Sequence, residues 1–384
     1  MLILRPLPHM SRTTDRRSGR DDSLRVVVVD DSPFMRGLIA DLLTDAGVTV
    51  VGEAGDGAEA LSVVAETRPD VVTMDVEMPG MGGLEAVERL MDETPTPVLM
   101  LSAHTAEGAE VTFEALDRGA VDFFSKPGGE VSTGVSRESD RLVEAVTSVA
   151  DADLTAATRD RRERDPAGGA SGSSGRASGS RPDAAGSPGG ETADVDAPLT
   201  VVIGASTGGP NAVERVMAAL PMADCRVLIV QHMPEAFTSR FADRLDEASA
   251  YDVREASDGT RIGAGEALVA RGGSHTRVDS YRAGRLRVRL AEDGSQSVTP
   301  AADVTMRSAA EVIDDPLVGV VLTGMGADAS AGIRAMADAG ARTIAQSEDT
   351  CVIYGMPKRA VETGGVDEVC DLDDVAGAIV GGEA

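Results

Sequence analysis

The sequence predicts an α/β protein with two doubly wound parallel-sheet domains joined by a flexible linker. Strand-length apolar runs alternate with helix-like stretches from residue 25 to about 150, and the same alternation resumes at 198. Between these two parts the periodicity vanishes and Gly, Ser, Ala and Pro dominate, as in a flexible tether. We therefore divide the chain into a disordered leader (1–24), a first domain (25–150), the linker (151–197) and a second domain (198–384).

The chain of 384 residues is strongly acidic. It has 64 acidic and 36 basic residues, a formal net charge of −28, 2% aromatic residues and no tryptophan. Nucleic acids and anionic membranes require a cationic surface, and base stacking requires aromatic side chains. We therefore predict no nucleic-acid binding and no membrane insertion. Acidity spread over both halves is typical of proteins from salt-loving organisms, where salt screens the self-repulsion.

The cysteines indicate a reducing compartment. Cys225, Cys351 and Cys370 form no C-x-x-C pair and are odd in number, which argues against a disulfide framework or a zinc site. No apolar run reaches the length needed to span a membrane. We expect a cytoplasmic protein, and a monomer by default.

The first domain reads as five strand–helix units. The expected strands are 25–29, 49–52, 71–74, 98–101 and 121–124, and the expected helices are 33–46, 57–67, 84–93, 108–118 and 137–150. Such alternation predicts a parallel sheet with helices on both faces.

Polar residues follow the strands of this domain directly. Because the carboxyl ends of parallel strands meet at one edge, we expect these side chains to converge there: Asp30, Asp31, Asp75, Ser102 and Lys126. Clustered carboxylates favour a hard cation such as Mg²⁺, which also binds a phosphoryl oxygen. Lys126 would supply a charge and Ser102 a hydrogen bond to the same anion. Asp75 then becomes a carboxylate nucleophile able to form an acyl phosphate.

These residues resemble those of two-component receiver domains. The matching stretches are Asp30-Asp-Ser-Pro33, Asp75-x-x-Met-Pro-x-Met-x-Gly83, Ser102-Ala-His104 and Lys126-Pro127. The resemblance implies that Asp75 accepts phosphate from a histidine kinase. It also implies that Asp31, Asp75 and the Glu77 carbonyl hold Mg²⁺, with Asp30 close by. Phe123 occupies the family's aromatic switch position, and His104 is expected to be a surface loop residue.

The second domain opens with a serine on a strand-to-helix turn. An apolar strand ends at Gly204-Ala-Ser206, and Gly208-Gly-Pro210 opens a segment with helical spacing. A serine placed there is held out at the carboxyl edge of a sheet, where amides of the helix start face it. Taken alone, the turn could equally bind phosphate or be merely structural.

A histidine and an aspartate also follow strands of this domain. His232 comes after the apolar run 227–230, and Asp328 comes shortly after 317–322. A hydroxyl, an imidazole and a carboxylate at one edge are the parts of an activated nucleophile. The rival base is His275, between two segments that look like hairpin strands; strand placement favours His232.

Residues 198–380 resemble the catalytic domain of the CheB methylesterase family. The order Ser, His, Asp differs from the α/β-hydrolase order that the Gly-x-Ser-x-Gly pattern would otherwise suggest. The stretches that carry the resemblance are Gly204–Pro210, Gln231-His-Met-Pro234 with Phe237, Thr323–Asp328, Ala345-Gln346 and Tyr354–Lys358. Ser206, His232 and Asp328 would be the triad, and the Met325 backbone N–H would help hold the oxyanion.

The resemblance implies an activity and its control. The expected reaction is hydrolysis of glutamate γ-methyl esters on chemoreceptors (methyl-accepting chemotaxis proteins), with deamidation of receptor glutamine as a second activity. No cofactor is expected for the ester chemistry. In the family the unmodified receiver covers the catalytic cleft, and phosphorylation relieves this. Two alternatives are a response regulator with a non-catalytic output, which would need a basic recognition helix, and a small-ester hydrolase, which would need a strongly apolar pocket.

Overall fold

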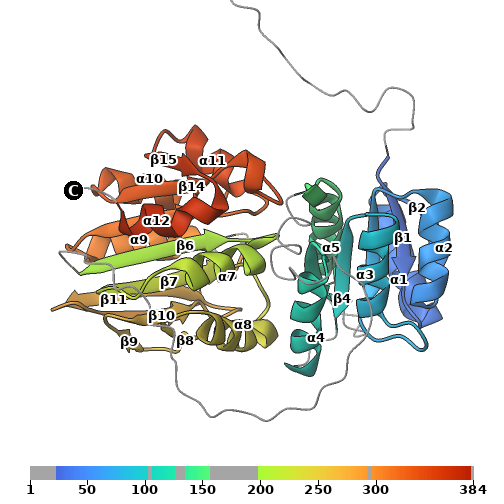
Figure 1. Cartoon of the computed structure of the whole chain (residues 1–384), viewed down its shortest axis with the longest axis horizontal. Helices are drawn as coiled ribbons and strands as arrows, with labels where there is room; N and C mark the ends of the chain where they lie inside the picture. Colours follow the sequence, from blue (N-terminus) through green and yellow to red (C-terminus); the bar gives the residue numbers. More distant parts are fainter. Residues whose placement is uncertain are drawn as a thin grey trace, which may run out of the picture.

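The computed structural model describes residues 23–102, 106–126, 135–155, 198–292, 296 and 298–381. Most of the predicted leader and most of the predicted linker lie outside these residues, as does His104. Two parallel sheets, each with its own helices, form the two halves seen in Figure 1. Among the described residues, no helix is both long and apolar enough to cross a membrane.

The first sheet has five parallel strands in the order β2-β1-β3-β4-β5. The strands are β1 (Arg25–Val29), β2 (Thr49–Ala54), β3 (Val71–Asp75), β4 (Val98–Ser102) and β5 (Asp122–Ser125). The helices are α1 (Pro33–Asp45), α2 (Gly57–Thr67), α3 (Gly83–Glu93), α4 (Ala106–Asp117) and α5 (Val135–Ala150). The five predicted units are therefore confirmed, with bounds shifted by at most two residues.

Helices cover both faces of this sheet because the side chains on both faces of its central strands are apolar. In β1, Val26 and Val28 pack with residues of α1 and α5, such as Leu43. Val27 and Val29 pack on the other face, with residues of α2 and α3. A strand that is apolar on both faces belongs in the middle of a doubly wound sheet.

The second sheet has seven parallel strands in the order β15-β14-β13-β6-β7-β10-β8. The strands are β6 (Leu199–Ala205), β7 (Cys225–Gln231), β8 (Asp252–Glu255), β10 (Glu266–Val269), β13 (Leu317–Val321), β14 (Arg342–Gln346) and β15 (Glu368–Cys370). The helices are α7 (Gly209–Ala219), α8 (Glu235–Ala248), α9 (Ala302–Val312), α10 (Ser330–Asp338), α11 (Met356–Glu362) and α12 (Val375–Val380). The sequence neighbour β7 and the later strand β13 flank β6, so the strand order reverses at β6, where open α/β sheets bind ligands.

A small antiparallel sheet is added to the second domain. It consists of β11 (His275–Arg282), β12 (Arg285–Ala291) and β9 (Arg261–Ile262), in the order β11-β12-β9. The turn between β11 and β12 has positive φ at both Ala283 and Gly284, as tight hairpins require. The predicted hairpin is confirmed, but His275 is the first residue of its first strand rather than lying between the strands.

The two domains pack together through aromatic side chains. Phe113 of α4 and Phe123 of β5 meet two phenylalanines of α8: the Phe123 ring stacks on Phe237 with centroids 4.5 Å apart, and Phe113 stacks on Phe241 at 5.9 Å. Figure 1 shows α4 and α5 on the side of the first domain that faces the second. The residue at the predicted switch position thus lies in the domain interface.

Candidate active site

Ser206 lies in the turn between β6 and α7, and close packing fixes that turn. Gly208 has φ +73°, and a Cβ atom there would lie 2.7 Å from Cβ of Val352. A Cβ on Gly209 would lie 2.1 Å from Oε1 of Gln231. The Gln231 amide donates to the Ser206 carbonyl at 2.8 Å, so these glycines are sterically required and the serine backbone is held from both sides.

His232 and Asp328 form a direct hydrogen bond. Nε2 of His232 lies 2.7 Å from Oδ2 of Asp328. The carboxylate also accepts from the backbone N–H of Ala302 at 2.6 Å and of Asp303 at 3.0 Å. Burial by itself would raise the pKa of Asp328, but the bonds from His232 and the two amides outweigh it and lower that pKa below its usual value. Asp328 is therefore held as an anion beside the imidazole.

The turn that carries Ser206 lies beside the ends of the strands that lead to His232 and Asp328, because β6 is the strand between β7 and β13. The backbone N–H of His232 donates to the Ala205 carbonyl at 3.1 Å, and the backbone N–H of Ser206 donates to the Thr323 carbonyl at 3.0 Å. The three predicted residues thus project from one edge of three adjacent strands. Because Nε2 of His232 bonds Asp328, Nδ1 is the ring nitrogen left for another partner.

The loop that carries Met325 runs directly against the serine. A Cβ on Gly324 would lie 2.8 Å from Cβ of Ser206, so only glycine fits there. The Met356 N–H donates to the Gly324 carbonyl at 2.7 Å and fixes the loop from the other side. Within the described parts of the chain, the Met325 N–H has no protein acceptor, so it is available to a ligand at the serine.

His275, the rival base, lies behind this site rather than in it. Its side chain is fully buried, and Nδ1 accepts a hydrogen bond from the Ala301 N–H at 3.1 Å. The next two amides, of Ala302 and Asp303, are those that bind Asp328. Sequence reasoning missed this supporting role, because no local pattern links His275 to residues 26 positions away.

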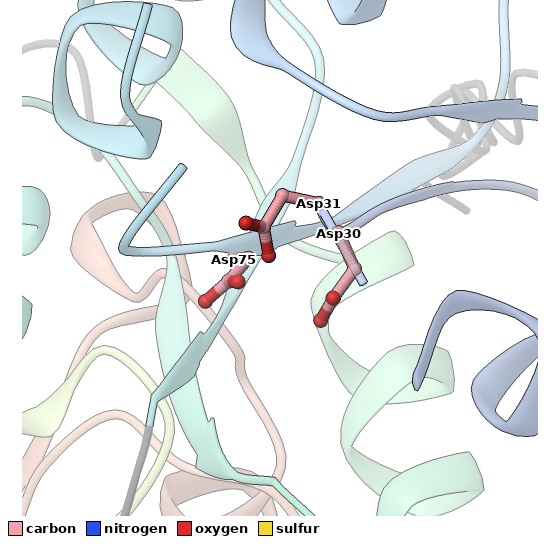
Figure 2. A group of neighbouring side chains, drawn as sticks. All are labelled: Asp30, Asp31 and Asp75. Carbon is pink, nitrogen blue, oxygen red and sulfur yellow. The ribbon is translucent and has the colours of Figure 1, made fainter. Parts of the chain in front are cut away.

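In the first domain the three predicted carboxylates meet at the end of β1 and β3. Figure 2 shows Asp30, Asp31 and Asp75 together, and one carboxylate oxygen from each lies within 4.8 Å of the others. Nζ of Lys126 lies 2.9 Å from Oδ2 of Asp30 and 2.6 Å from Oδ2 of Asp75. Burial raises the pKa of Asp75 above its usual value, although Lys126 acts to lower it. Three clustered oxygen donors fit a hard divalent cation.

The remaining predicted residues of this cluster lie around Asp75. The Glu77 N–H donates to Oδ1 of Asp75 at 3.4 Å, which places the Glu77 backbone beside the carboxylates. Ser102 is buried at the end of β4, and its hydroxyl donates to the Gly108 carbonyl at 3.3 Å. The structure therefore brings all the predicted receiver residues to one sheet edge.

Comparison with known proteins identifies the family. The family model for CheB methylesterase matches residues 201–379, and the model for the response regulator receiver domain matches residues 26–132. A protein-glutamate methylesterase/protein-glutamine glutaminase of Haloarcula marismortui is 58% identical over 371 residues, which are 94% of this chain and 97% of that protein. The chain belongs to the CheB family of protein-glutamate methylesterases.

Other members and structures are similar. A methylesterase/glutaminase of Halobacterium salinarum is 56% identical over 355 residues, covering 92% of this chain and 96% of that protein. The solved catalytic domain of Thermotoga maritima CheB methylesterase is 35% identical and covers 47% of this chain and 97% of that one, with a TM-score of 0.45. The predicted fold class and the resemblance to CheB methylesterases are confirmed.

In this member of the CheB family the receiver packs against the sheet edge that carries the Ser206 turn. A gap between the domains is lined by Leu116 and 119–121 of the receiver and by Gly208, Asn211 and Val352 of the catalytic domain. Burial raises the pKa of Asp122 to about 6, although the Phe123 amide, the Thr207 hydroxyl and the charge of His232 all act to lower it. A receiver carboxylate is therefore held beside the residue that follows Ser206.

An ion pair joins the domains beside the aromatic cluster. The guanidinium of Arg244 on α8 donates to both oxygens of Asp117 on α4, at 2.7 and 3.1 Å, and lies 5.6 Å from the ring centroid of Phe113. Arg244 also pairs with Glu214 of its own domain. Neither Arg244 nor Asp122 stands out in the sequence, because the contacts of Arg244 with Asp117 and of Asp122 with Thr207 form only when the domains pack.

Proposed function

We propose that this chain is a receiver-controlled protein-glutamate methylesterase. It hydrolyses glutamate γ-methyl esters on chemoreceptors, methyl-accepting chemotaxis proteins, to glutamate and methanol. The observation that carries the proposal is the His232–Asp328 pair at 2.7 Å beside a serine turn, in a chain of this family.

The chemistry follows from the three side chains. Ser206 is a weak nucleophile until its proton moves to His232, and Asp328 orients the imidazole and stabilises its charged form. Attack on the ester carbonyl gives a tetrahedral oxyanion, which accepts a hydrogen bond from the Met325 N–H. Collapse expels methanol, protonated by His232, and leaves the glutamyl group on Ser206.

The second half of the reaction uses water. His232 takes a proton from the water that attacks the acyl-enzyme, and returns it to the serine oxygen as glutamate leaves. A glutamine carboxamide can enter the same cycle, with ammonia as the first leaving group. Deamidation of receptor glutamine is therefore part of the proposed function.

The receiver supplies the control. Asp75 accepts a phosphoryl group from a histidine kinase, CheA, through its carboxylate. Asp30, Asp31, Asp75 and the Glu77 carbonyl would hold Mg²⁺, which when bound neutralises charge on the carboxylates and the phosphoryl oxygens. Ser102 and Lys126 contact the phosphoryl oxygens. The new charge at Asp75 biases the docked pair of domains toward separation and uncovers Ser206.

The remaining features of the proposal come from the sequence. The domain bounds are 25–150 for the receiver and 198–384 for the esterase, with 151–197 as the tether. The protein works in the cytoplasm as a monomer, and the ester chemistry needs no cofactor.

The proposal is tested by methanol release from a methylated receptor fragment. Ser206→Ala should lower turnover by about 10⁴–10⁶-fold, because the nucleophile is lost. The control is Ser257→Ala, an exposed serine that bonds Thr260 away from the site. Substantial methanol release by Ser206→Ala, with the control active, would overturn the assignment.

A further inference from the structure

The outer face of the small antiparallel sheet is cationic in a chain whose net charge is −28. Val278, Leu286 and Val288 point inward and are buried. The opposite face carries six arginines, all exposed except the half-buried Arg287. We name this set the arginine face: Arg261, Arg277, Arg282, Arg285, Arg287 and Arg289.

The strand register sets these arginines against one another. Arg277 is opposite Arg289, Arg282 is opposite Arg285, and Arg287 is opposite Arg261. Like charges directly across a sheet are destabilising. A sequence that places three such pairs on one face gains nothing in folding from them, which points to a partner outside the fold.

Few carboxylates of the chain compensate this charge. Asp279 lies 3.4 Å from Arg287 and 3.2 Å from Arg289, and Glu266 lies 3.3 Å from Arg285. Asp258 lies at the rim, where it accepts from the Leu290 N–H. Throughout the described part of the chain, the other three arginines of the face make no ion pair: Arg261, Arg277 and Arg282.

The arginine face begins beside the esterase site and stays open while the receiver is docked. His275, the first residue of β11, bonds the turn that holds Asp328, and Arg277 follows two residues later. From there β11 runs away from the receiver, as Figure 1 shows. A partner could therefore occupy this face before the serine is uncovered.

We propose that the arginine face binds a glutamate-rich helical surface of the chemoreceptor, next to the esterified residue. This inference rests on the proposed function, in which each ester hydrolysed leaves a carboxylate on the receptor. Glutamates three or four residues apart on a helix lie about 5–6 Å apart. Neighbouring strands are about 4.8 Å apart, and like-facing residues along a strand are about 6.8 Å apart, so the arginines match that spacing.

Arginine suits this task better than lysine. Its planar guanidinium binds a carboxylate through two parallel hydrogen bonds, whereas an ammonium group acts as a point charge. Charge screening leaves electrostatic attraction with a range of only about 3 Å at 1 M salt, and several relatives of this chain come from halophilic organisms. Contact through hydrogen bonds survives such salt, but long-range attraction does not. The acidity of the rest of the chain disfavours nucleic acid as the partner.

The test uses the full chain and a methylated receptor fragment. Arg277→Gln with Arg282→Gln removes two arginines of the face without leaving a carboxylate unpaired. We expect KM for methanol release to rise by about tenfold or more with kcat retained, because uniform binding is lost. Arg277→Lys with Arg282→Lys should show an intermediate KM. The control is Arg334→Gln, an exposed arginine paired with Asp338 on α10, which should leave KM unchanged.

Two further measurements separate the possible outcomes. The Gln double variant should melt at the same temperature as the wild type or higher, since like-charge repulsion is relieved; a lower melting temperature would indicate a structural role and overturn the proposal. Calorimetry measures binding of the receptor fragment to the arginine face directly. If the wild type released no methanol, the proposed function would fail, but calorimetry would still test the arginine face. Unchanged receptor binding in the double variant would overturn the proposal. The proposal would also be overturned if the wild type bound a DNA duplex of about 20 base pairs tightly, and the double variant lost DNA binding but kept receptor binding.

Discussion

Removing the Arg244–Asp117 ion pair between the domains should raise the unphosphorylated esterase activity. We choose Asp117→Asn on the receiver side, because Arg244 also pairs with Glu214, so that replacing Arg244 would disturb a contact within the catalytic domain as well. Asparagine keeps the shape of the side chain but offers only one acceptor oxygen and no charge. The bidentate contact at 2.7 and 3.1 Å is therefore lost without a cavity.

The expected size of the effect follows from the exposure of the pair. Hydrogen bonds to charged groups contribute about 1.5–3 kcal/mol when they are well buried, and exposed ion pairs contribute about 0–1 kcal/mol. The Arg244 side chain is 17% exposed and Asp117 is 40% exposed, so solvent screens the carboxylate end. We take about 1 kcal/mol, which is about a fivefold shift toward separated domains. Basal methanol release should rise by the same factor, provided that most molecules start docked.

The assay compares methanol release without a phosphodonor in the wild type, Asp117→Asn and Glu88→Gln. Glu88 pairs with Arg118 within the receiver at 2.7 Å, so its variant makes the same charge change away from the domain contact. Raising the salt should shrink the ratio of Asp117→Asn to wild-type activity, because salt weakens the partly exposed pair. Equal basal activity in the wild type and Asp117→Asn at low salt would refute the argument that this contact holds the site covered.

Two further predictions concern Asp122, in the domain interface, and His275, which supports the turn that holds Asp328. In the docked state burial raises the pKa of Asp122 to about 6, so the docked state favours the protonated carboxyl group. The association of the two domains therefore weakens as the pH rises through that value. Wild-type basal activity should therefore gain more than that of Asp122→Asn from about pH 5 to about pH 7. His275→Leu should lower kcat about 10–100-fold, because Ala301 loses its acceptor and the turn that holds Asp328 loosens. His275→Asn should recover most of that loss, since its side-chain oxygen can accept in place of Nδ1.

Each of these predictions has an outcome that opposes it. Parallel pH profiles of the wild type and Asp122→Asn would show that this carboxylate does not take part in docking. For His275, equal losses in the Asn and Leu variants would point to packing rather than to the hydrogen bond. A pH profile of kcat that shifts in the Leu variant and returns in the Asn variant would mark a positioning role.

Most of the fold could be predicted from the sequence because its strands are buried on both faces. Runs such as 26–29 and 201–203 are apolar without interruption, and polar residues such as Asp30 and Ser206 follow them at the carboxyl edge. The same rule located the carboxylates of the receiver and the serine, histidine and aspartate of the second domain. It works because parallel strands bring distant residues together at one edge.

The supporting contacts could not be predicted in this way. His275 begins a hairpin strand with no apolar pattern that distinguishes a base from a buried acceptor, and its partner Ala301 offers only a backbone amide. The contacts of Asp122 and Arg244 depend on how two domains pack, which periodicity within either domain does not encode. Local sequence patterns determine where the strands of one sheet end, but they do not determine which residues meet in a domain interface.

The most direct test of the account is methanol release from a methylated receptor by the full chain, before and after a small-molecule phosphodonor is added with Mg²⁺. We predict low release before addition and a marked rise after it, with no rise in Asp75→Asn, because only a phosphorylated receiver uncovers Ser206. Release that is equally fast before and after addition, or a rise that persists in Asp75→Asn, would contradict control of this serine by the receiver.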